Sequence, residues 1–402
     1  MEPGQFKKKL IESFIGNVAT MLLNLAFPFV VTTLYGTTIL GKFTYNLSII
    51  TIFLFVASLG LSVGLIFFIP RTGNRYVSST LLINMVLSLL LMFAGFLIFK
   101  DIEMRIMLPF LWLLSAEIVF KSLFQTKHQI KEFFFINLLV HQGIKIGLAL
   151  LLGFFIAPTL INLIIASYIG LIIALVIYLY MNRDMIGPIN FSIAIIKYSL
   201  PLSVSNLIYV FMISIDKIMI GNIKGKDAVA IYAVASMFAL IPSIFLTVLN
   251  TIFPTVISKM YHEGKIVELQ AIYKKSVRIL SIISTITIMI IIFFSNDLLA
   301  LYGPEYLEGR IVLIFIAIGQ LVNASVGSVW FTITMTGHSN WNMYGKLVTF
   351  VINITLNILL IPRFGIGGAA FATMASTSFS NILGFIIVKK IFSDALAESE
   401  LS

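Results

Sequence analysis

Two pairs of ionisable residues lie inside otherwise apolar stretches, and their types and spacing could support binding or proton transfer. Glu117 and Lys121 are four residues apart, and so are His141 and Lys145. Residues at this spacing share one face of a helix. A carboxylate near an imidazole and an ammonium could bind an anion, relay a proton or only neutralise charge, whereas Lys121 could instead extend its ammonium to the membrane interface.

Asp216 and Lys217 form a third ionisable pair within an apolar stretch. Adjacent residues on a helix point about 100° apart, so both cannot face one partner. We expect one to face a cavity and the other a neighbouring helix or the outer interface, with an interhelical ion pair as the alternative. A charged side chain at the centre of a membrane helix costs roughly 2.5–3.5 kcal/mol on insertion scales, which makes Asp216 and Glu117 candidates for ion coupling.

Other polar residues extend this set. Lys346 lies near the inner end of a later apolar stretch, where it could line a cavity or reach the interface. Asn17 and Asn24 are seven residues apart and share one face of the first stretch; interhelical hydrogen bonding is the alternative to a cavity role. The predicted substrate-binding or cavity residues are Lys145, His141, Glu117, Asp216, Lys217, Lys346, Asn17 and Asn24.

The composition shows what kind of element must position these residues. The chain has 402 residues, of which 59% are hydrophobic and 11% charged, and its mean hydropathy is +1.05. Soluble domains carry roughly 25% charged residues, so lipid must be the solvent for most of this chain. A cytosolic enzyme, a secreted disulfide scaffold and a disordered regulator are excluded. The net charge of +10 indicates basic cytoplasmic loops rather than a nucleic-acid partner.

Twelve apolar runs are long enough to span a membrane. Prolines and glycines predict very short turns at Pro158 and at 362–365, helix kinks at Pro28, Pro201 and Pro242, and close helix packing at Gly60-x-x-x-Gly64 and Gly143-x-x-x-Gly147. The runs cover residues 11–35, 42–70, 78–99, 105–125, 133–156, 159–182, 198–222, 228–258, 277–302, 309–335, 341–361 and 364–391.

The predicted fold is an all-α integral membrane protein of about twelve transmembrane helices in two six-helix bundles, arranged as parallel half-repeats. Residues 1–182 would form the N-terminal bundle, 183–197 a cytoplasmic linker, 198–391 the C-terminal bundle and 392–402 a cytoplasmic tail. A second polar cytoplasmic linker is expected at 259–276. With the N-terminus inside, 18 Lys and Arg lie at inner ends and 7 at outer ends, which favours both termini in the cytoplasm.

Motifs for cofactor chemistry fail on inspection. The segment from Gly36 to Phe43 reads as a phosphate-binding loop except at its last position, where Phe43 replaces the Ser or Thr that holds magnesium. Four histidines and no cysteine give no zinc cluster of normal spacing. We therefore expect no metal, no cofactor and no enzymatic activity. A membrane-bound polymerase or acyltransferase is disfavoured because a polymerase should carry a large outer loop, and the longest one here is about 296–309.

Several segments of the second half resemble the multidrug, oligosaccharidyl-lipid and polysaccharide exporter superfamily, and within it the bacterial O-antigen and capsule flippases. These segments are Ser199–Asn206 leading to Ser214–Gly221, Ala228–Ala235, Asn357–Pro362 and Gly365–Thr373. Asp216 matches the charged position typical of the seventh span. Lys145 and Lys346 lie where basic residues often occur. The first two spans lack the arginines of lipid II flippases, and spans thirteen and fourteen are absent.

This resemblance implies a flippase in the cytoplasmic (inner) membrane that moves a polyprenyl-diphosphate-linked oligosaccharide from the inner to the outer leaflet by alternating access, coupled to an ion gradient. The partners would be that lipid-linked oligosaccharide, membrane lipids, and polysaccharide polymerase and chain-length proteins. A cation-coupled multidrug antiporter of the same superfamily is the first alternative, although lysines outnumber carboxylates in the spans and favour an anionic cargo. A passive assembly component is another.

Overall fold

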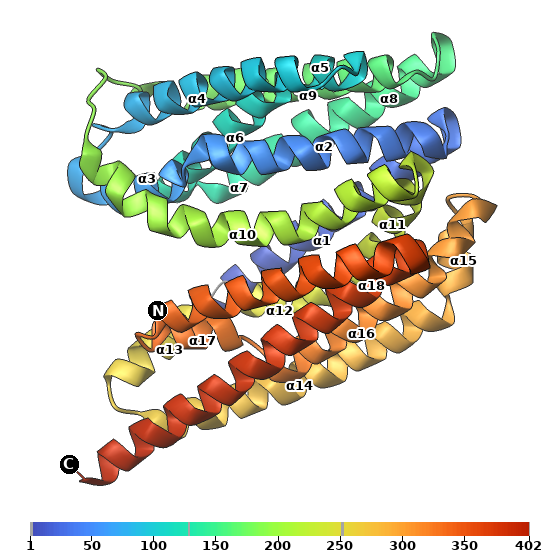
Figure 1. The fold of residues 1–402 in the computed structure, drawn as a ribbon. Helices are drawn as coiled ribbons and strands as arrows, with labels where there is room; N and C mark the ends of the chain where they lie inside the picture. Colours follow the sequence, from blue (N-terminus) through green and yellow to red (C-terminus); the bar gives the residue numbers. More distant parts are fainter. Residues whose placement is uncertain (1–2, 128, 251–252, 402) are drawn as a thin grey trace. The chain divides into compact units, whose positions relative to one another are not determined.

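The computed structural model describes residues 3–127, 129–250 and 253–401, and every regular element in these ranges is a helix. The chain divides into two compact units, which we call the N-unit (residues 26–221) and the C-unit (residues 1–25 with 222–402). Two long helices cross the division, α1 (Pro3–Tyr35) between Leu25 and Ala26 and α10 (Ile193–Ile223) at Gly221. The chain is coloured along its length in Figure 1.

The N-unit contains helices α2 to α9, several of them broken within one predicted span. Gly36 has a φ of 86° and ends α1, and the left-handed pair Leu59 and Gly60 separates α2 from α3. The elements are α2 (Thr37–Ser58), α3 (Leu61–Thr72), α4 (Val77–Ile98), α5 (Ile102–Met107), α6 (Phe110–Thr126), α7 (Ile130–Phe135), a π-helix (Ile136–Gln142), α8 (Gly143–Phe155), α9 (Leu160–Met181) and a 3-10 turn (Arg183–Met185).

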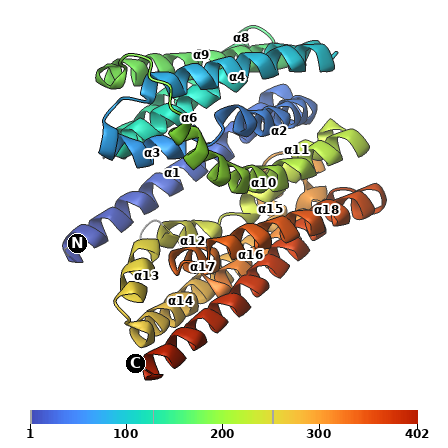
Figure 2. The ribbon, with the colours of Figure 1, turned by 60° about the vertical axis from the view of Figure 1, so that its left-hand side comes forward.

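The C-unit is built around the long helices α14, α16 and α18, which pack side by side (Figure 2). Gly365, with φ 56° and ψ −135°, breaks α18 into two arms, because this conformation is disfavoured for residues with a Cβ. The elements are α11 (Lys226–Ala239), α12 (Ser243–Asn250), α13 (Phe253–His262), α14 (Ile266–Phe293), α15 (Ser295–Ala300), a 3-10 segment (Pro304–Gly309), α16 (Arg310–Val326), α17 (Val329–Met335) and α18 (Ser339–Leu401).

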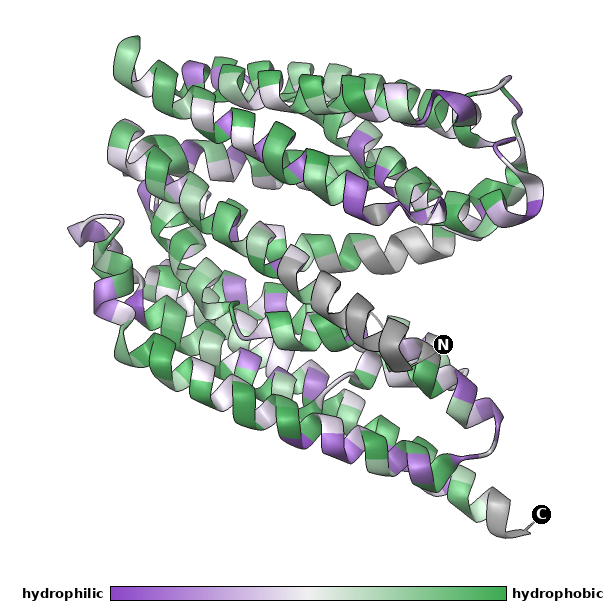
Figure 3. Cartoon of the chain, turned by 180° about the vertical axis from the view of Figure 1, so that it is seen from behind, coloured by the Kyte–Doolittle hydropathy of each residue, from purple (hydrophilic) through white to green (hydrophobic). Residues whose placement is uncertain are grey.

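The helices are long and apolar enough to cross a membrane. Nine candidate spans are found in the described residues, or ten when α11 and α12, bent by 63°, are taken as one. If the two arms of α18 are counted separately and the 31-residue α10 is added, the ten spans become the twelve that were predicted. Hydrophobic residues run along most of the helix lengths (Figure 3), and large side chains such as Phe93, Phe155 and Phe293 are exposed, as lipid-facing residues would be.

The predicted short turns are confirmed, but the polar linkers are more ordered than expected. Thr159 caps α9 by accepting a hydrogen bond from the Asn162 amide at 3.3 Å, next to the turn at Pro158. The expected linker at 259–276 is helical from Ile266, because Ile266, Leu269 and Tyr273 place a buried apolar face on an otherwise polar segment. Helix α18 likewise continues through the predicted tail to Leu401.

The predicted glycine contacts are half right. A Cβ at Gly64 would lie 2.2 Å from Ser199 Oγ, so α3 and α10 do pack closely there. Around Gly147 there is nothing within 4 Å, so the Gly143-x-x-x-Gly147 prediction is wrong. The close approach is instead made from the facing helix α9, where a Cβ at Gly170 would lie 2.5 Å from the His141 carbonyl oxygen.

Candidate functional site

A buried polar cluster in the N-unit joins the fourth and fifth predicted spans. Glu117 on α6 accepts a hydrogen bond from Asn137 Nδ2 at 2.8 Å, and the same oxygen, Oε1, lies 3.1 Å from His141 Nδ1. Asn137 Nδ2 also lies 3.4 Å from His141 Nδ1. Glu117 and His141 are 9% and 7% exposed. The three side chains therefore form one closed polar group within an apolar bundle.

A π-helix positions two of these three residues. Asn137 and His141 both lie in the segment Ile136–Gln142, where the hydrogen bonds run from residue i to i+5 rather than i+4. The wider turn brings residues four apart more nearly onto one line than an α-helix does, so both side chains reach the same carboxylate. Short π segments often occur at functional sites. The sequence analysis missed Asn137, because a π register has no signature in the apolar pattern.

Lys145 follows the π segment by one turn and lies on α8. Its ammonium is 4.0 Å from the centre of the Phe27 ring, an arrangement that stabilises a cation through the negative face of the ring. Phe27 in turn packs against Phe43, with 5.6 Å between ring centres. Glu117 is the carboxylate whose charge acts on Lys145. Lys145 is half-buried as a residue, and its charge interacts with the carboxylate of the cluster.

Lys121, the other lysine of the predicted pairs, stays outside this cluster. Its side chain is exposed, and its ammonium lies 5.9 Å and 6.0 Å from the ring centres of Phe133 and Phe134. An exposed lysine over aromatic rings fits the alternative given for Lys121 from the sequence, in which its ammonium reaches the membrane interface. Glu117 and Lys121 share α6, but only Glu117 joins His141.

Asp216 and Lys217 lie on α10, also within the N-unit. Asp216 is 2% exposed and Lys217 is half-buried, so the two adjacent side chains differ in environment as their 100° separation requires. The Asp216 charge acts on Lys217.

The remaining predicted residues lie in the C-unit. Lys346 is half-buried on the first arm of α18, next to Gly345, whose Cβ would lie 2.1 Å from the Trp330 ring. That close approach fixes the arm against α17. On α1, Asn17 is half-buried and Asn24 is exposed. Whether these side chains line a transport cavity stays a prediction.

The C-unit also holds a polar ladder that sequence reasoning missed. Asn357 Nδ2 donates to Asn353 Oδ1 at 3.1 Å, and Asn353 Nδ2 donates to Ser376 Oγ at 3.3 Å, which joins the two arms of α18. Asparagines four apart in an apolar helix were the available signal. This ladder fits a structural hydrogen-bond role between helices.

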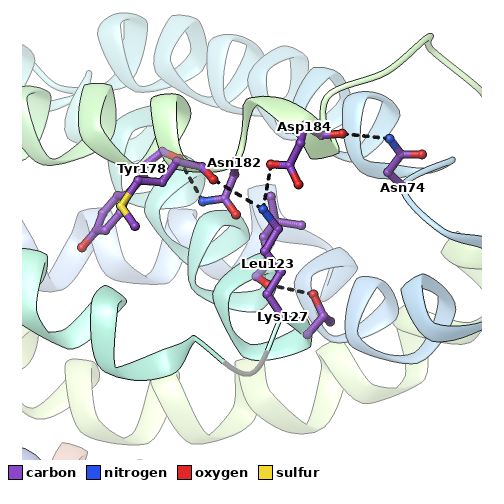
Figure 4. Close-up of polar contacts among 8 residues, drawn as sticks. Asn74, Leu123, Lys127, Tyr178, Asn182 and Asp184 are labelled. Carbon is purple, nitrogen blue, oxygen red and sulfur yellow. Dashed lines mark hydrogen bonds and ion pairs between the residues drawn. The ribbon is translucent and has the colours of Figure 1, made fainter.

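The predicted linker 183–197 is held against the N-unit. Lys127 at the end of α6 pairs with Asp184 at 2.7 Å, and Asn74 Nδ2 donates to the Asp184 carbonyl at 3.3 Å (Figure 4). The hydrogen bond from Lys127 lowers the pKa of the Asp184 carboxyl. Asn182 Nδ2 donates to the Tyr178 carbonyl at 2.9 Å and extends the end of α9.

Two serines at the start of α4 complete this attachment. Ser78 Oγ donates to the Gly187 carbonyl at 2.6 Å and accepts from the Gly187 amide at 3.1 Å. Ser79 does the same with Asn190, at 2.5 Å and 2.8 Å. From residue 193 the chain is already helical in α10. The segment is therefore an ordered part of the N-unit rather than a free connection.

Comparison with known proteins shows which family the sequence matches. The sequence profile of the family described as polysaccharide biosynthesis protein matches residues 6–261, and the MatE profile matches residues 201–359. The chain is 27% identical over 195 residues to the capsular polysaccharide biosynthesis protein CapF of Staphylococcus aureus, covering 48% of this chain and 49% of that protein. It is 27% identical over 176 residues to the "Probable flippase AglR" of Haloferax volcanii, covering 42% and 36%. The chain thus matches about half or less of the length of these curated relatives.

Solved structures show the same fold over nearly the whole chain. An inward-facing multidrug resistance MATE family transporter of the MOP superfamily superposes with a TM-score of 0.78 at 13% identity, over 94% of this chain and 96% of that one. A MOP superfamily transporter from Pyrococcus furiosus, described as having a binding pocket of reversed polarity, superposes with a TM-score of 0.70 at 13% identity, over 97% and 96%. The chain is therefore an all-helical, multi-pass membrane protein with the fold of these transporters.

Proposed function

The chain belongs to the polysaccharide biosynthesis protein family, and from this premise we propose that it is a flippase that moves a polyprenyl-diphosphate-linked oligosaccharide from the inner to the outer leaflet of the cytoplasmic membrane. Two of its curated relatives carry the word flippase in their names, one of them for glycan biosynthesis. The transporter fold supplies the means of moving a cargo. The proposal includes no enzymatic step, because translocation changes no covalent bond.

The observation that carries the proposal is the half-buried cation Lys145. A diphosphate must lose much of its hydration to cross the membrane interior, and a preorganised ammonium offers a charge-assisted partner. Lys217, also half-buried in the N-unit, would serve the same anion, and Lys346 in the C-unit remains a separate candidate cavity residue. A drug antiporter that exports organic cations would need an excess of carboxylates instead.

Coupling would use the buried carboxylates. Glu117, joined to His141 and Asn137, is placed to exchange a proton, and Asp216 is the second candidate. The proposed motion is alternating access by the bundles 1–182 and 198–391, both termini being cytoplasmic. We place no hinge between residues 184 and 190, because Ser78, Ser79 and Lys127 hold that segment. Membrane lipids, a polysaccharide polymerase and chain-length proteins are the proposed partners.

Leaflet translocation in proteoliposomes tests the function. The cargo is a polyprenyl-diphosphate oligosaccharide, compared with a cationic dye, for the wild type, Lys145→Ala and Asp216→Asn. The matched control is Lys265→Ala, which removes an exposed lysine that pairs with Glu263 at 2.8 Å outside the predicted spans. We expect lipid-linked sugar to move in the wild type and the control, movement to be lost in Lys145→Ala, and the dye to be ignored.

The same assay can reject the proposal. Dye movement driven by a proton or sodium gradient, without lipid movement, would make the protein a drug antiporter. Full lipid movement in Lys145→Ala would remove this lysine from the anion site. Movement of neither cargo by well-folded protein would contradict the proposed function and favour a passive assembly role.

A further inference from the structure

Helix α4 carries a stripe of buried polar residues that the proposed function does not use. Thr80, Asn84 and Ser88 are spaced four residues apart and so lie on one face of the helix. All three are at most 2% exposed. Each step along the stripe is about 6 Å, from the rise of an α-helix. The stripe leads from the start of α4 into the apolar interior of the N-unit.

The helices packed against α4 bring further polar side chains to the same unit. Helices α2, α4 and α6 pack against one another in the N-unit. Asn46 on α2 and Ser115 on α6 are 4% and 0% exposed. Ser88 lies eleven residues after Val77, where α4 begins, and Ser115 lies eleven residues before Thr126, where α6 ends. Since α4 and α6 belong to consecutive, antiparallel spans, both serines lie about 16 Å from the same end of the bundle.

These side chains lack hydrogen-bond partners. Within the described part of the chain, no partner is found for Thr80 Oγ1, Ser88 Oγ, Ser115 Oγ, Asn46 Nδ2 or either amide atom of Asn84. Hydroxyls in apolar helices usually donate to a carbonyl of the preceding turn, as Ser48 and Ser122 do here. Leaving buried polar atoms unpaired is unfavourable, so six such atoms on three helices that pack against one another point to a ligand.

The chemistry of the unpaired atoms selects that ligand. Two amide nitrogens are donors only, one amide oxygen is an acceptor only, and three hydroxyls are both. A dehydrated cation would find no carboxylate in this set to balance its charge. An anion would find no positive side chain in this set. Water donates and accepts, and buried water typically makes about three hydrogen bonds to groups that would otherwise be unpaired.

We propose that the α2–α4–α6 interior binds a file of ordered water molecules along Thr80, Asn84 and Ser88, ending beside Ser115 and Asn46. This site is separate from the Glu117 cluster. Ser115 and Glu117 are two residues apart on α6 and so point about 200° apart, from opposite sides of the helix. Solvent therefore reaches about half the membrane thickness inside the N-unit by a route that does not pass through the Glu117 cluster.

A structure of the wild-type protein in lipid nanodiscs, at a resolution that resolves ordered water, tests this directly. We expect density at hydrogen-bond distance from the Asn84 amide and from the hydroxyls of Ser88 and Ser115. Apolar packing with no density around Asn84 would overturn the proposal. Density that becomes stronger when sodium is replaced by the electron-rich rubidium would also overturn it, in favour of a cation site.

The direction of a change in Tm gives an independent test. Asn84→Leu, which nearly preserves side-chain shape, should lower the Tm by several degrees if it displaces bound water that bridges polar groups. If the interior is dry, the same change removes two unpaired atoms and should raise the Tm, which would contradict the proposal. Thr80→Val should act in the same direction as Asn84→Leu. Ser284→Ala, which removes a lone buried hydroxyl on α14 in the C-unit, is the matched control.

Discussion

Glu117 Oε1 lies 3.1 Å from His141 Nδ1, and both residues are buried, Glu117 at 9% and His141 at 7% exposed. This contact joins two helices that are predicted membrane spans. Asn137 holds the same carboxylate oxygen at 2.8 Å. The pair thereby has a fixed geometry, as a proton-coupled step requires.

The first prediction concerns the energetic coupling of this pair. In a double-mutant cycle with Glu117→Gln and His141→Asn, the two changes should be non-additive by about 0.5–3 kcal/mol, the range seen for residues in one hydrogen-bond network. Thermal unfolding in detergent measures it. A control cycle pairs Glu117→Gln with Glu103→Gln, a residue that forms an ion pair with Lys42 elsewhere in the N-unit. Additive effects in the first cycle would show that Glu117 and His141 do not interact.

The second prediction concerns the aromatic support of Lys145. Phe27→Leu should weaken binding of an anionic lipid headgroup by about 0.5–2 kcal/mol, or roughly two- to thirty-fold in Kd, because the ring no longer orients the ammonium 4.0 Å away. Titration of a polyprenyl diphosphate into nanodisc-embedded protein measures it. Phe93→Leu, at an exposed position on α4, should leave Kd unchanged. Equal losses in both variants would argue against a specific role for the Phe27 ring.

The third prediction compares two glycines of adjacent helices. Gly170→Ala should destabilise the protein by about 1–3 kcal/mol, the usual cost of overpacking, because its Cβ would meet the His141 carbonyl oxygen at 2.5 Å. Gly147→Ala has open space and should be neutral or stabilising, by up to about 1 kcal/mol from helix propensity. Thermal unfolding of the two variants decides this. The opposite order would mean that α8 and α9 do not approach at Gly170.

The fourth prediction is a pH dependence of stability. The hydrogen bond from Lys127 lowers the pKa of Asp184 in the folded state below its unfolded value. Its stabilisation is therefore fully present above the unfolded pKa and is lost as the pH falls through the folded pKa. Because Asp184 is 63% exposed, screening limits the effect to about 0.2–1 kcal/mol. Asp184→Asn should remove this part of the acid sensitivity as the pH falls below about 4, the ordinary pKa of an aspartate.

The wild type and Asp184→Asn are compared by thermal unfolding across that pH range. Lys127→Met removes the partner of Asp184. At neutral pH it should lower the stability of the protein by about as much as Asp184→Asn does. An unchanged acid dependence in both variants would show that the Lys127–Asp184 pair does not contribute to stability.

The sequence by itself determined the solvent, the helical class and most of the breaks between spans. Long apolar runs can satisfy their backbone groups in lipid only as helices, which is why the spans and the turn near Gly365 could be predicted locally. It also singled out Glu117, His141 and Lys145 as candidate site residues, because ionisable residues are rare in such runs. Their mutual arrangement needed the structure.

Only the tertiary structure decided which side chains meet. The π register that brings Asn137 to Glu117 changes a hydrogen-bonding pattern while leaving the apolar spacing almost unaltered, so no sequence period reports it. The close contact at Gly170 rather than Gly147 depends on the facing helix. The same holds for the buried stripe at Asn84, because a helical pattern says which residues share a face but not what that face packs against.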